Sequence, residues 1–363
     1  MPKSKTKIYL EKLQKKKRAQ KKYALARYYQ MNSILGNQCM FYIILGGRKT
    51  GKSYAGGEFL IKQKRELKDQ CKNYWLRISE ESVKYMKQNK CKAFIDPDLQ
   101  EKYKLDLESK GMYILNHGKE WMTVMSLSSF GKMKGVGFYD KNYKGWYNIV
   151  LDEFQLEQGE KRTSFDILYN FIGMLENIVR TTKMKLRVFL FGNTLEEASS
   201  ILKAFNFIPN GFGRYYLHKW NKYTHKRELY AVLDNLEPTE EYLEDRYGSA
   251  ADILGGDKMS NYTNELRKDL DMLTAQRTKK PTSIIMFSKD EGDWFTVWDG
   301  NIIKRYNKET ISNKIAMIPH IPAPYNLEIK AYVTDMYDAR AWKFRDLITQ
   351  QYFIDNMMKL RKK

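Results

Sequence analysis

Five short apolar runs, each bounded by glycine or polar residues, predict the strands of one sheet. They cover residues 40–45, 74–78, 121–125, 147–151 and 187–191. Short apolar runs without polar alternation are typical of strands buried on both faces, as in a parallel sheet. Helix-favouring stretches lie between several of them, notably 53–67 and 165–180. The alternation predicts an α/β fold with a mostly parallel sheet that helices cover on both faces.

The pattern changes after about residue 215. The stretches 239–247 and 261–277 are polar and helix-favouring, which predicts a helical linker subdomain. Apolar runs return at 283–287, 294–298 and 301–304, and Asp299-Gly300 is a tight-turn dipeptide between the last two. These runs predict a separate, small α+β domain at the end of the chain.

The charge balance changes the picture, because it points to a partner. The chain has 363 residues with 64 Lys and Arg against 43 Asp and Glu, a net charge of +21. Such an excess, together with 14% aromatic residues, favours nucleic acid, although a merely soluble basic protein is the alternative. The expected organisation is a basic N-terminal arm (1–35), the α/β domain (36–215), the helical linker (216–278) and the α+β domain (279–363).

The arm itself is strongly basic. Its first thirty residues carry eleven Lys and Arg side chains, opposed only by Glu11. Blocks of like charge often form nucleic-acid-binding tails, and residues 11–29 are good helix formers. A solvated tail remains the alternative interpretation.

Other classes of protein are disfavoured by what the sequence lacks. No run of about eighteen apolar residues predicts a membrane-spanning helix, and the Lys-rich start has no apolar signal region. Cys39, Cys71 and Cys91 show no metal-ligand spacing, so free thiols in a reducing cytoplasm are expected.

A phosphate-binding loop follows the first apolar run. The pattern Gly-x-x-x-x-Gly-Lys-Ser stands between a predicted strand and a predicted helix, as this loop requires. Its backbone amides would surround the phosphates of ATP, Lys52 would reach the β- and γ-phosphates, and Ser53 would bind Mg²⁺. The loop comprises Gly46, Gly47, Arg48, Lys49, Thr50, Gly51, Lys52 and Ser53.

Acidic residues end the fourth apolar run. Asp152 is expected to hold Mg²⁺, and Glu153 is expected to activate the attacking water as general base. About a hundred residues separate the two motifs, which fits ATPases with an additional strand between the motif strands. Asn193 ends the next strand and would either sense the γ-phosphate or cap the helix after it.

Taken together, these motifs resemble those of the double-stranded DNA packaging ATPases of tailed phages. The short length, the Leu151-to-Phe154 end of the strand and the segment 176–180 make the likeness closest to the picovirus-like type. The resemblance covers residues 40–215 well and the remainder loosely. It implies the additional-strand, catalytic-glutamate class and a homomeric ring, a pentamer in this family.

The resemblance also implies residue roles and partners. Arg180 matches the arginine that acts on the neighbouring subunit's nucleotide, and Lys134 matches a second basic residue, with Lys132 near enough to leave that choice open. The implied partners are double-stranded DNA, the portal of the procapsid and a packaging RNA. The implied location is the host cytoplasm and, transiently, the portal vertex.

A segment rich in glycine, lysine and aromatic residues spans 128–146. Such a loop suits contact with a phosphate backbone, which is independent of base sequence and sensitive to salt. Its candidate DNA-binding residues are Lys132, Lys134, Lys141 and Lys144.

The C-terminal domain departs from the nuclease pattern of larger packaging proteins. Asp290, Glu291 and Asp293 follow the first candidate strand, but they form no convincing two-metal site. The resemblance therefore implies a vestigial RNase H-like fold for gripping nucleic acid or docking on the portal, without nuclease activity. The basic residues expected to serve this domain are Lys304, Arg305, Lys343, Arg345 and the run 359–363.

The function predicted is an ATP-hydrolysing ring motor that moves duplex DNA into a procapsid. The alternatives are another DNA-translocating ring ATPase, such as a segregation or conjugation pump or a helicase loader, a nucleotide-switched nucleic-acid scaffold, and a small-molecule kinase. The absence of a membrane anchor disfavours the membrane-bound pumps. Glu153 favours hydrolysis over a mere switch, and the basic excess disfavours the kinase.

Overall fold

The chain divides into two compact units in the computed structural model. The first comprises Met1–Leu195, Ser199–Ile201 and Gly211–Leu266, and the second comprises Glu196–Ala198, Leu202–Asn210 and Arg267–Lys363. The structure describes residues 28–133, 142–155, 166–179, 185–193, 199–209, 211–244, 247–249, 253, 272–276, 280–289, 294–307, 317–323 and 326–362.

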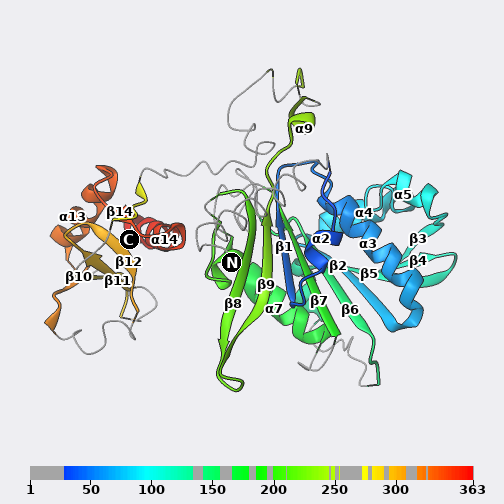
Figure 1. Ribbon diagram of the computed structural model, residues 1–363, viewed down its shortest axis with the longest axis horizontal. Helices are drawn as coiled ribbons and strands as arrows, with labels where there is room; N and C mark the ends of the chain where they lie inside the picture. Colours follow the sequence, from blue (N-terminus) through cyan, green and yellow to red (C-terminus); the bar gives the residue numbers. More distant parts are fainter. Residues whose placement is uncertain are drawn as a thin grey trace, which may run out of the picture. The chain divides into compact units, whose positions relative to one another are not determined.

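The first unit is built on one sheet, which has nine strands within the described residues, in the order β3-β4-β5-β2-β6-β7-β1-β9-β8 (Figure 1). The central strands β2, β6, β7, β1 and β9 are parallel, and both ends of the sheet are antiparallel. The strands are β1 (Phe41–Leu45), β2 (Cys71–Arg77), β3 (Leu107–Lys110), β4 (Tyr113–Asn116), β5 (Lys119–Ser126), β6 (Trp146–Asp152), β7 (Lys185–Gly192), β8 (Gly213–Asn221) and β9 (Lys226–Asn235).

The five predicted strands are confirmed as β1, β2, β5, β6 and β7. Strand β7 lies between β1 and β6, because Val188 pairs with Phe41 on one side and Ile149 on the other. The additional strand between the two motif strands is therefore present. Continuous apolar runs form these strands because both faces are buried; Ile43 and Leu190 have no exposed surface.

Helices and short helical turns connect the strands. The helices predicted at 53–67 and 165–180 are confirmed as α3 and α7. The elements of this part of the chain are α2 (Asn32–Leu35), α3 (Lys52–Leu67), η1 (Lys68–Gln70), α4 (Glu80–Cys91), α5 (Pro97–Lys102), η2 (Leu127–Ser129), α6 (Phe130–Met133), α7 (Ile167–Ile178), α8 (Ser200–Ala204) and α9 (Glu240–Glu244).

The helical linker expected over 216–278 is wrong for its first twenty residues. This stretch forms most of the β8–β9 hairpin, and β9 pairs with β1 in the main sheet. The outer half of the hairpin is polar and exposed, so it lacks the long apolar run that marks a buried strand. The helix predicted at 239–247 is the shorter α9, and most of the one at 261–277 lies outside the described residues.

The second unit is a small α+β structure, as predicted for the end of the chain. Its described residues include a five-stranded sheet in the order β13-β10-β11-β12-β14, with a core between the sheet and its helices that contains Phe295, Phe344 and Phe353. At the predicted turn, Asp299 and Gly300 have φ angles of 50° and 90°, as a tight hairpin requires. The elements are β10 (Pro281–Met286), β11 (Trp294–Trp298), β12 (Ile302–Arg305), β13 (His320–Pro322), α13 (Leu327–Asp338), β14 (Lys343–Phe344) and α14 (Leu347–Lys362).

Among the residues that the structure describes, no helix is long and apolar enough to cross a membrane.

Candidate nucleotide-binding site

The predicted phosphate loop joins the end of β1 to the start of α3. Gly51 has a φ of 87°, a left-handed conformation that glycine adopts without strain, and Lys52 opens the helix. A Cβ on Gly46 would lie 2.9 Å from the end of the Leu236 side chain, so a larger residue there would displace Leu236. The loop therefore wraps around the helix N-terminus, where its amides and the helix dipole favour an anion.

The Lys52 side chain is held inside the loop. Its Nζ donates to the carbonyl oxygens of Gly46 and Gly47, both at 2.8 Å, and to Thr50 Oγ1 at 3.2 Å. Burial lowers the pKa of Lys52 to about 8, and the nearby Asp152 carboxylate opposes that shift. Because loop carbonyls now hold the ammonium group, phosphate oxygens can take their place without moving the lysine into water.

Asp152 ends β6 beside the loop, as predicted. Ser53 Oγ lies 3.2 Å from each carboxylate oxygen of Asp152, so the two predicted magnesium ligands lie within hydrogen-bonding distance of each other. These are hard oxygen donors, and Mg²⁺ usually takes few protein ligands, keeping waters and phosphate oxygens for the rest. The residues therefore fit Mg²⁺ bound together with a nucleotide; the described residues hold no cluster of three or more acidic, His or Cys side chains that could bind a metal alone.

Arg77, which sequence reasoning missed, contacts both acids at the end of β6. Its guanidinium donates to Asp152 Oδ2 at 2.8 Å and to the Glu153 carboxylate. Burial raises the pKa of the Asp152 carboxyl, and Arg77 opposes that rise. Arg77 ends β2, which pairs with β6, so the signal was its position at the end of a strand adjacent to the acid-bearing one.

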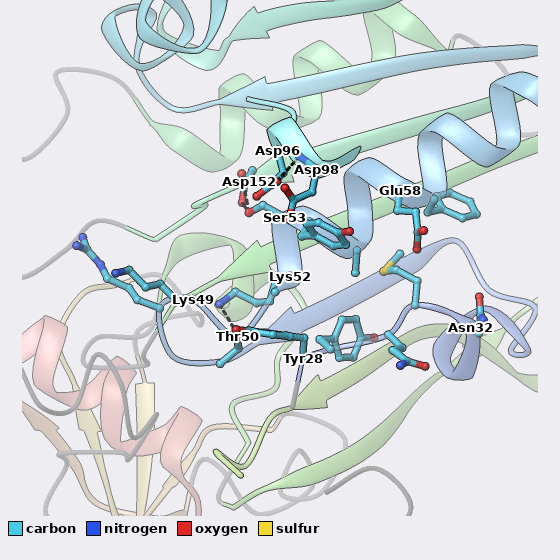
Figure 2. A pocket seen from close by; sticks show the side chains of 18 of the residues that line it. Tyr28, Asn32, Lys49, Thr50, Lys52, Ser53, Glu58, Asp96, Asp98 and Asp152 are labelled. Atoms are coloured by element: carbon cyan, nitrogen blue, oxygen red, sulfur yellow. Dashed lines mark hydrogen bonds between the residues drawn. The ribbon is translucent and has the colours of Figure 1, made fainter. Parts of the chain in front are cut away.

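The loop opens into a cavity of about 1220 Å³ (Figure 2). Residues just before β1 form one wall: Tyr29 N donates to Thr50 O at 2.9 Å, and Tyr28 packs against Gly51. An aromatic side chain here offers an apolar surface for a nucleobase. The lining residues include Tyr28, Tyr29, Met31, Asn32, Arg48, Lys49, Thr50, Gly51, Lys52, Ser53, Glu58, Phe59, Asp96, Asp98, Lys102, Asp152, Glu153 and Asn193.

A buried ion pair ties this wall to the edge of the sheet. Arg214 on β8 donates to both oxygens of Asp234 on β9, at 2.5 and 2.7 Å, and its NH1 donates to Ser33 O at 2.7 Å. Tyr29 Oη also donates to Asp234, at 3.1 Å. The segment before β1 is thus fixed by strands that follow it by some two hundred residues.

The loop is also held from α9. The hydroxyl of the buried Tyr242 donates to the backbone carbonyl of Arg48. A helix of the expected linker therefore contacts the phosphate loop, which no local pattern in the sequence revealed.

The other residues predicted for the nucleotide and DNA sites fall into three sets. Asn193 lines the cavity, and Glu153 lies beside it with its side chain mostly exposed. Lys144 is exposed before the start of β6, at the sheet edge opposite the phosphate loop. Arg180, Lys134, Lys141, Asp290, Glu291, Asp293 and the arm up to residue 27 lie outside the described residues, and of Lys132 only its place in α6 is described.

The phosphate loop on β1, the acid on β6 and the strand between them have the arrangement of a P-loop fold of the additional-strand class. The chain is similar to the phi28 gp11 DNA packaging motor, with a TM-score of 0.56 and 12% identity over 92% of this chain and 97% of that one. It is also similar to the bacteriophage phi29 viral genome packaging motor assembly, with a TM-score of 0.60 and 15% identity over 93% and 100%. No protein-family profile and no curated protein sequence matches the chain. At these identities the likeness shows a shared fold.

Proposed function

We propose that this chain is an ATP-hydrolysing ring motor that moves double-stranded viral DNA into a procapsid. One observation carries the proposal: Ser53, Asp152 and Glu153 meet beside the phosphate loop, in a fold shared with packaging motors over more than nine tenths of the chain. A site of this composition suits phosphoryl transfer to water.

Each residue of the site has a role in that reaction. Lys52 would exchange its loop carbonyls for the β- and γ-phosphates, and Ser53 and Asp152 would hold Mg²⁺. The metal neutralises charge that develops on the phosphates. Glu153 would orient and deprotonate the attacking water. Asn193, at the end of the adjacent strand β7, would sense the γ-phosphate.

The wider assembly is part of the same proposal. A net charge of +21 supports DNA as the load, gripped through Lys132, Lys134, Lys141 and Lys144. The ring, a pentamer in the family, would bring Arg180 and Lys134 or Lys132 to a neighbouring site. A portal and a packaging RNA would be its other partners. The C-terminal unit would be a vestigial RNase H-like fold. The protein would work in the host cytoplasm, at the portal vertex.

The decisive measurement is ATPase activity with and without duplex DNA across a salt series. Stimulation that fades as salt rises is expected, because phosphate contacts release counterions. Turnover without any DNA stimulation at low salt would instead favour the kinase, and absence of turnover would favour the nucleotide-switched scaffold.

Glu153→Gln tests the hydrolytic role within that assay. Nucleotide binding should persist while turnover falls by at least about 100-fold, the contribution typical of a general base. The matched control is Glu58→Gln, another cavity-lining glutamate, whose carboxylate accepts hydrogen bonds from Lys102 and Tyr103 instead. Undiminished turnover in Glu153→Gln would show that another group activates the water.

A further inference from the structure

The β8–β9 hairpin reaches well past the start of β1, the strand with which it pairs in the sheet. β1 pairs with β9 only over Ala231–Asn235, whereas the hairpin continues outward to the Asn221–Lys226 pair. Five residues of strand span about 16 Å. Because β9 runs parallel to β1, the turn lies at the edge of the sheet opposite the phosphate loop (Figure 1).

The turn at the end of the hairpin is held in one shape by its own side chains. Asn221 Oδ1 accepts from the backbone amides of Tyr223 and Thr224, at 2.9 and 3.2 Å. The Glu228 carboxylate accepts from the Asn221 amide at 2.9 Å and the Thr224 hydroxyl at 2.7 Å. A ligand that docks here meets a preformed surface, so binding costs little ordering entropy.

The outer half of the hairpin is a concentrated positive surface. Residues 216–228 contain four Lys and Arg residues and two His against one acid, Glu228, whose carboxylate bonds within the turn. All six of these side chains are exposed. The charge therefore favours a polyanion. The six are His218, Lys219, Lys222, His225, Lys226 and Arg227.

Aromatic rings stand among these charges. The register shift at Leu217 and His218 places the extra residue of the bulge on β9, so β8 keeps its alternation and Tyr216, His218 and Trp220 share one face. Tyr216 and Trp220 are 51% and 58% exposed, and Tyr223 in the turn is 82% exposed. Alternate strand residues are about 6.7 Å apart, roughly twice the ~3.4 Å rise between stacked bases.

We propose that the outer β8–β9 hairpin binds unpaired nucleotides of a single-stranded nucleic acid. The cations contact the phosphates, and the rings of Tyr216, Trp220 and Tyr223 stack with bases. Bases in a duplex are already stacked on one another, so a duplex would use the cations alone; exposed rings beside cations fit a strand whose bases are free. This surface is distinct from the nucleotide site, and its ligand differs from the proposed duplex load.

The test measures binding to the full chain without nucleotide, by fluorescence anisotropy. The probes are oligo-dT and oligo-U of about 20 nucleotides, longer than the roughly 4–16 that a small binding fold covers, and a duplex of equal length. The variant Tyr216→Ala/Trp220→Ala/Tyr223→Ala should bind the single strands at least about tenfold more weakly, since stacking contributes about 1–3 kcal/mol per base. Duplex affinity should change less than about threefold, which also reports that the variant is folded.

Three further variants make the result specific. Trp220→Phe in the otherwise intact chain should retain single-strand binding, because a ring remains. Tyr85→Ala removes a comparably exposed ring from α4, 57% exposed, and should have no effect. Lys222→Ala/Lys226→Ala should weaken every probe and lower the salt dependence of single-strand binding by about 1–2 units of slope. If the triple variant does not fold, Tyr223→Ala alone, at the turn, should weaken single-strand binding by about fivefold.

Unchanged single-strand affinity in the ring variant would overturn the proposal. An equal loss of affinity for single strand and duplex would overturn it as well, because the rings would then make no contact that is specific to unpaired bases. Ring-dependent binding of either single strand supports it, and tighter binding of oligo-U or of oligo-dT assigns RNA or DNA as the natural strand. None of these outcomes depends on ATP hydrolysis, so failure of the motor proposal would be recognised separately.

Discussion

Arg77 forms ion pairs with both acids of the candidate nucleotide site, Asp152 and Glu153. It is mostly buried, and it bonds to Asp152 and Glu153 at once from the neighbouring strand. Glu153 has a φ of 55°, a left-handed conformation that costs free energy for a residue with a side chain. The Arg77 contact helps to hold this carboxylate where the proposed chemistry needs it.

We expect Arg77→Ala to lower kcat for ATP hydrolysis by at least about tenfold, because Glu153 loses its positioning partner. The acidic limb of the kcat/KM profile should also move to higher pH. The sign follows from Asp152, whose pKa is raised by burial and lowered by Arg77. Without the arginine that pKa rises further, so Asp152 becomes protonated at a higher pH and would there lose the proposed Mg²⁺. Steady-state kinetics across pH check both effects.

Arg187→Ala is the matched control for Arg77→Ala. Arg187 lies on the neighbouring strand β7, and its guanidinium stacks on Trp146 at 3.7 Å from the ring centre, near the opposite edge of the sheet. Arg187→Ala should leave the acidic limb of the kcat/KM profile at the same pH as in the unchanged chain. An unmoved acidic limb in Arg77→Ala would contradict the electrostatic role given to Arg77.

At the scale of elements, the contact of α3 with the sheet places the phosphate loop. Gly56 of α3 packs directly on Phe191 of β7, where an added Cβ would lie 2.5 Å from the ring. The next residue, Gly57, has more room, since its Cβ would meet only the ends of two side chains, Ile95 at 3.3 Å and Leu99 at 3.7 Å. Two adjacent glycines of one helix therefore have different reasons to be there.

Gly56→Ala should lower the free energy of unfolding of the first unit by about 1–3 kcal/mol through overpacking, partly offset by the better helix propensity of alanine. Gly57→Ala should be neutral or stabilising by up to about 1 kcal/mol. Denaturant unfolding of both variants measures the difference. Equal stability of the two would show that α3 shifts away from the sheet at no cost.

At the scale of the whole molecule, the proposed motor requires more than one chain. The cavity is lined from one chain by the phosphate loop, Asp152 and Glu153. In the proposed ring, a neighbour would supply Arg180, whose positive charge would stabilise the transition state.

Mixing Arg180→Ala subunits with Lys52→Ala subunits should restore part of the ATPase activity that each variant lacks. Each variant damages a different half of a shared site, so some interfaces in a mixed ring are intact on both sides. A titration of the mixing ratio measures the rescue. Activity that stays at the sum of the separate variants at every ratio would place Arg180 outside the neighbouring site.

Much of the nucleotide site was determined by sequence alone. Lys52 and Ser53 belong to a contiguous loop, and Asp152 and Glu153 follow a strand that is apolar because it is buried on both faces. Parallel strands end at the same edge of a sheet, so these residues were expected to meet, and they do.

Only the tertiary structure decided which distant residues complete that site. Arg77 reaches the acids because β2 pairs with β6, and Tyr242 reaches Arg48 across 194 positions of sequence. The β8–β9 hairpin was missed because its outer half is exposed and charged, and such strands carry no apolar run. Sequence patterns record burial, which is local to each strand, whereas strand order and side-chain pairing are fixed by packing among segments far apart in the chain.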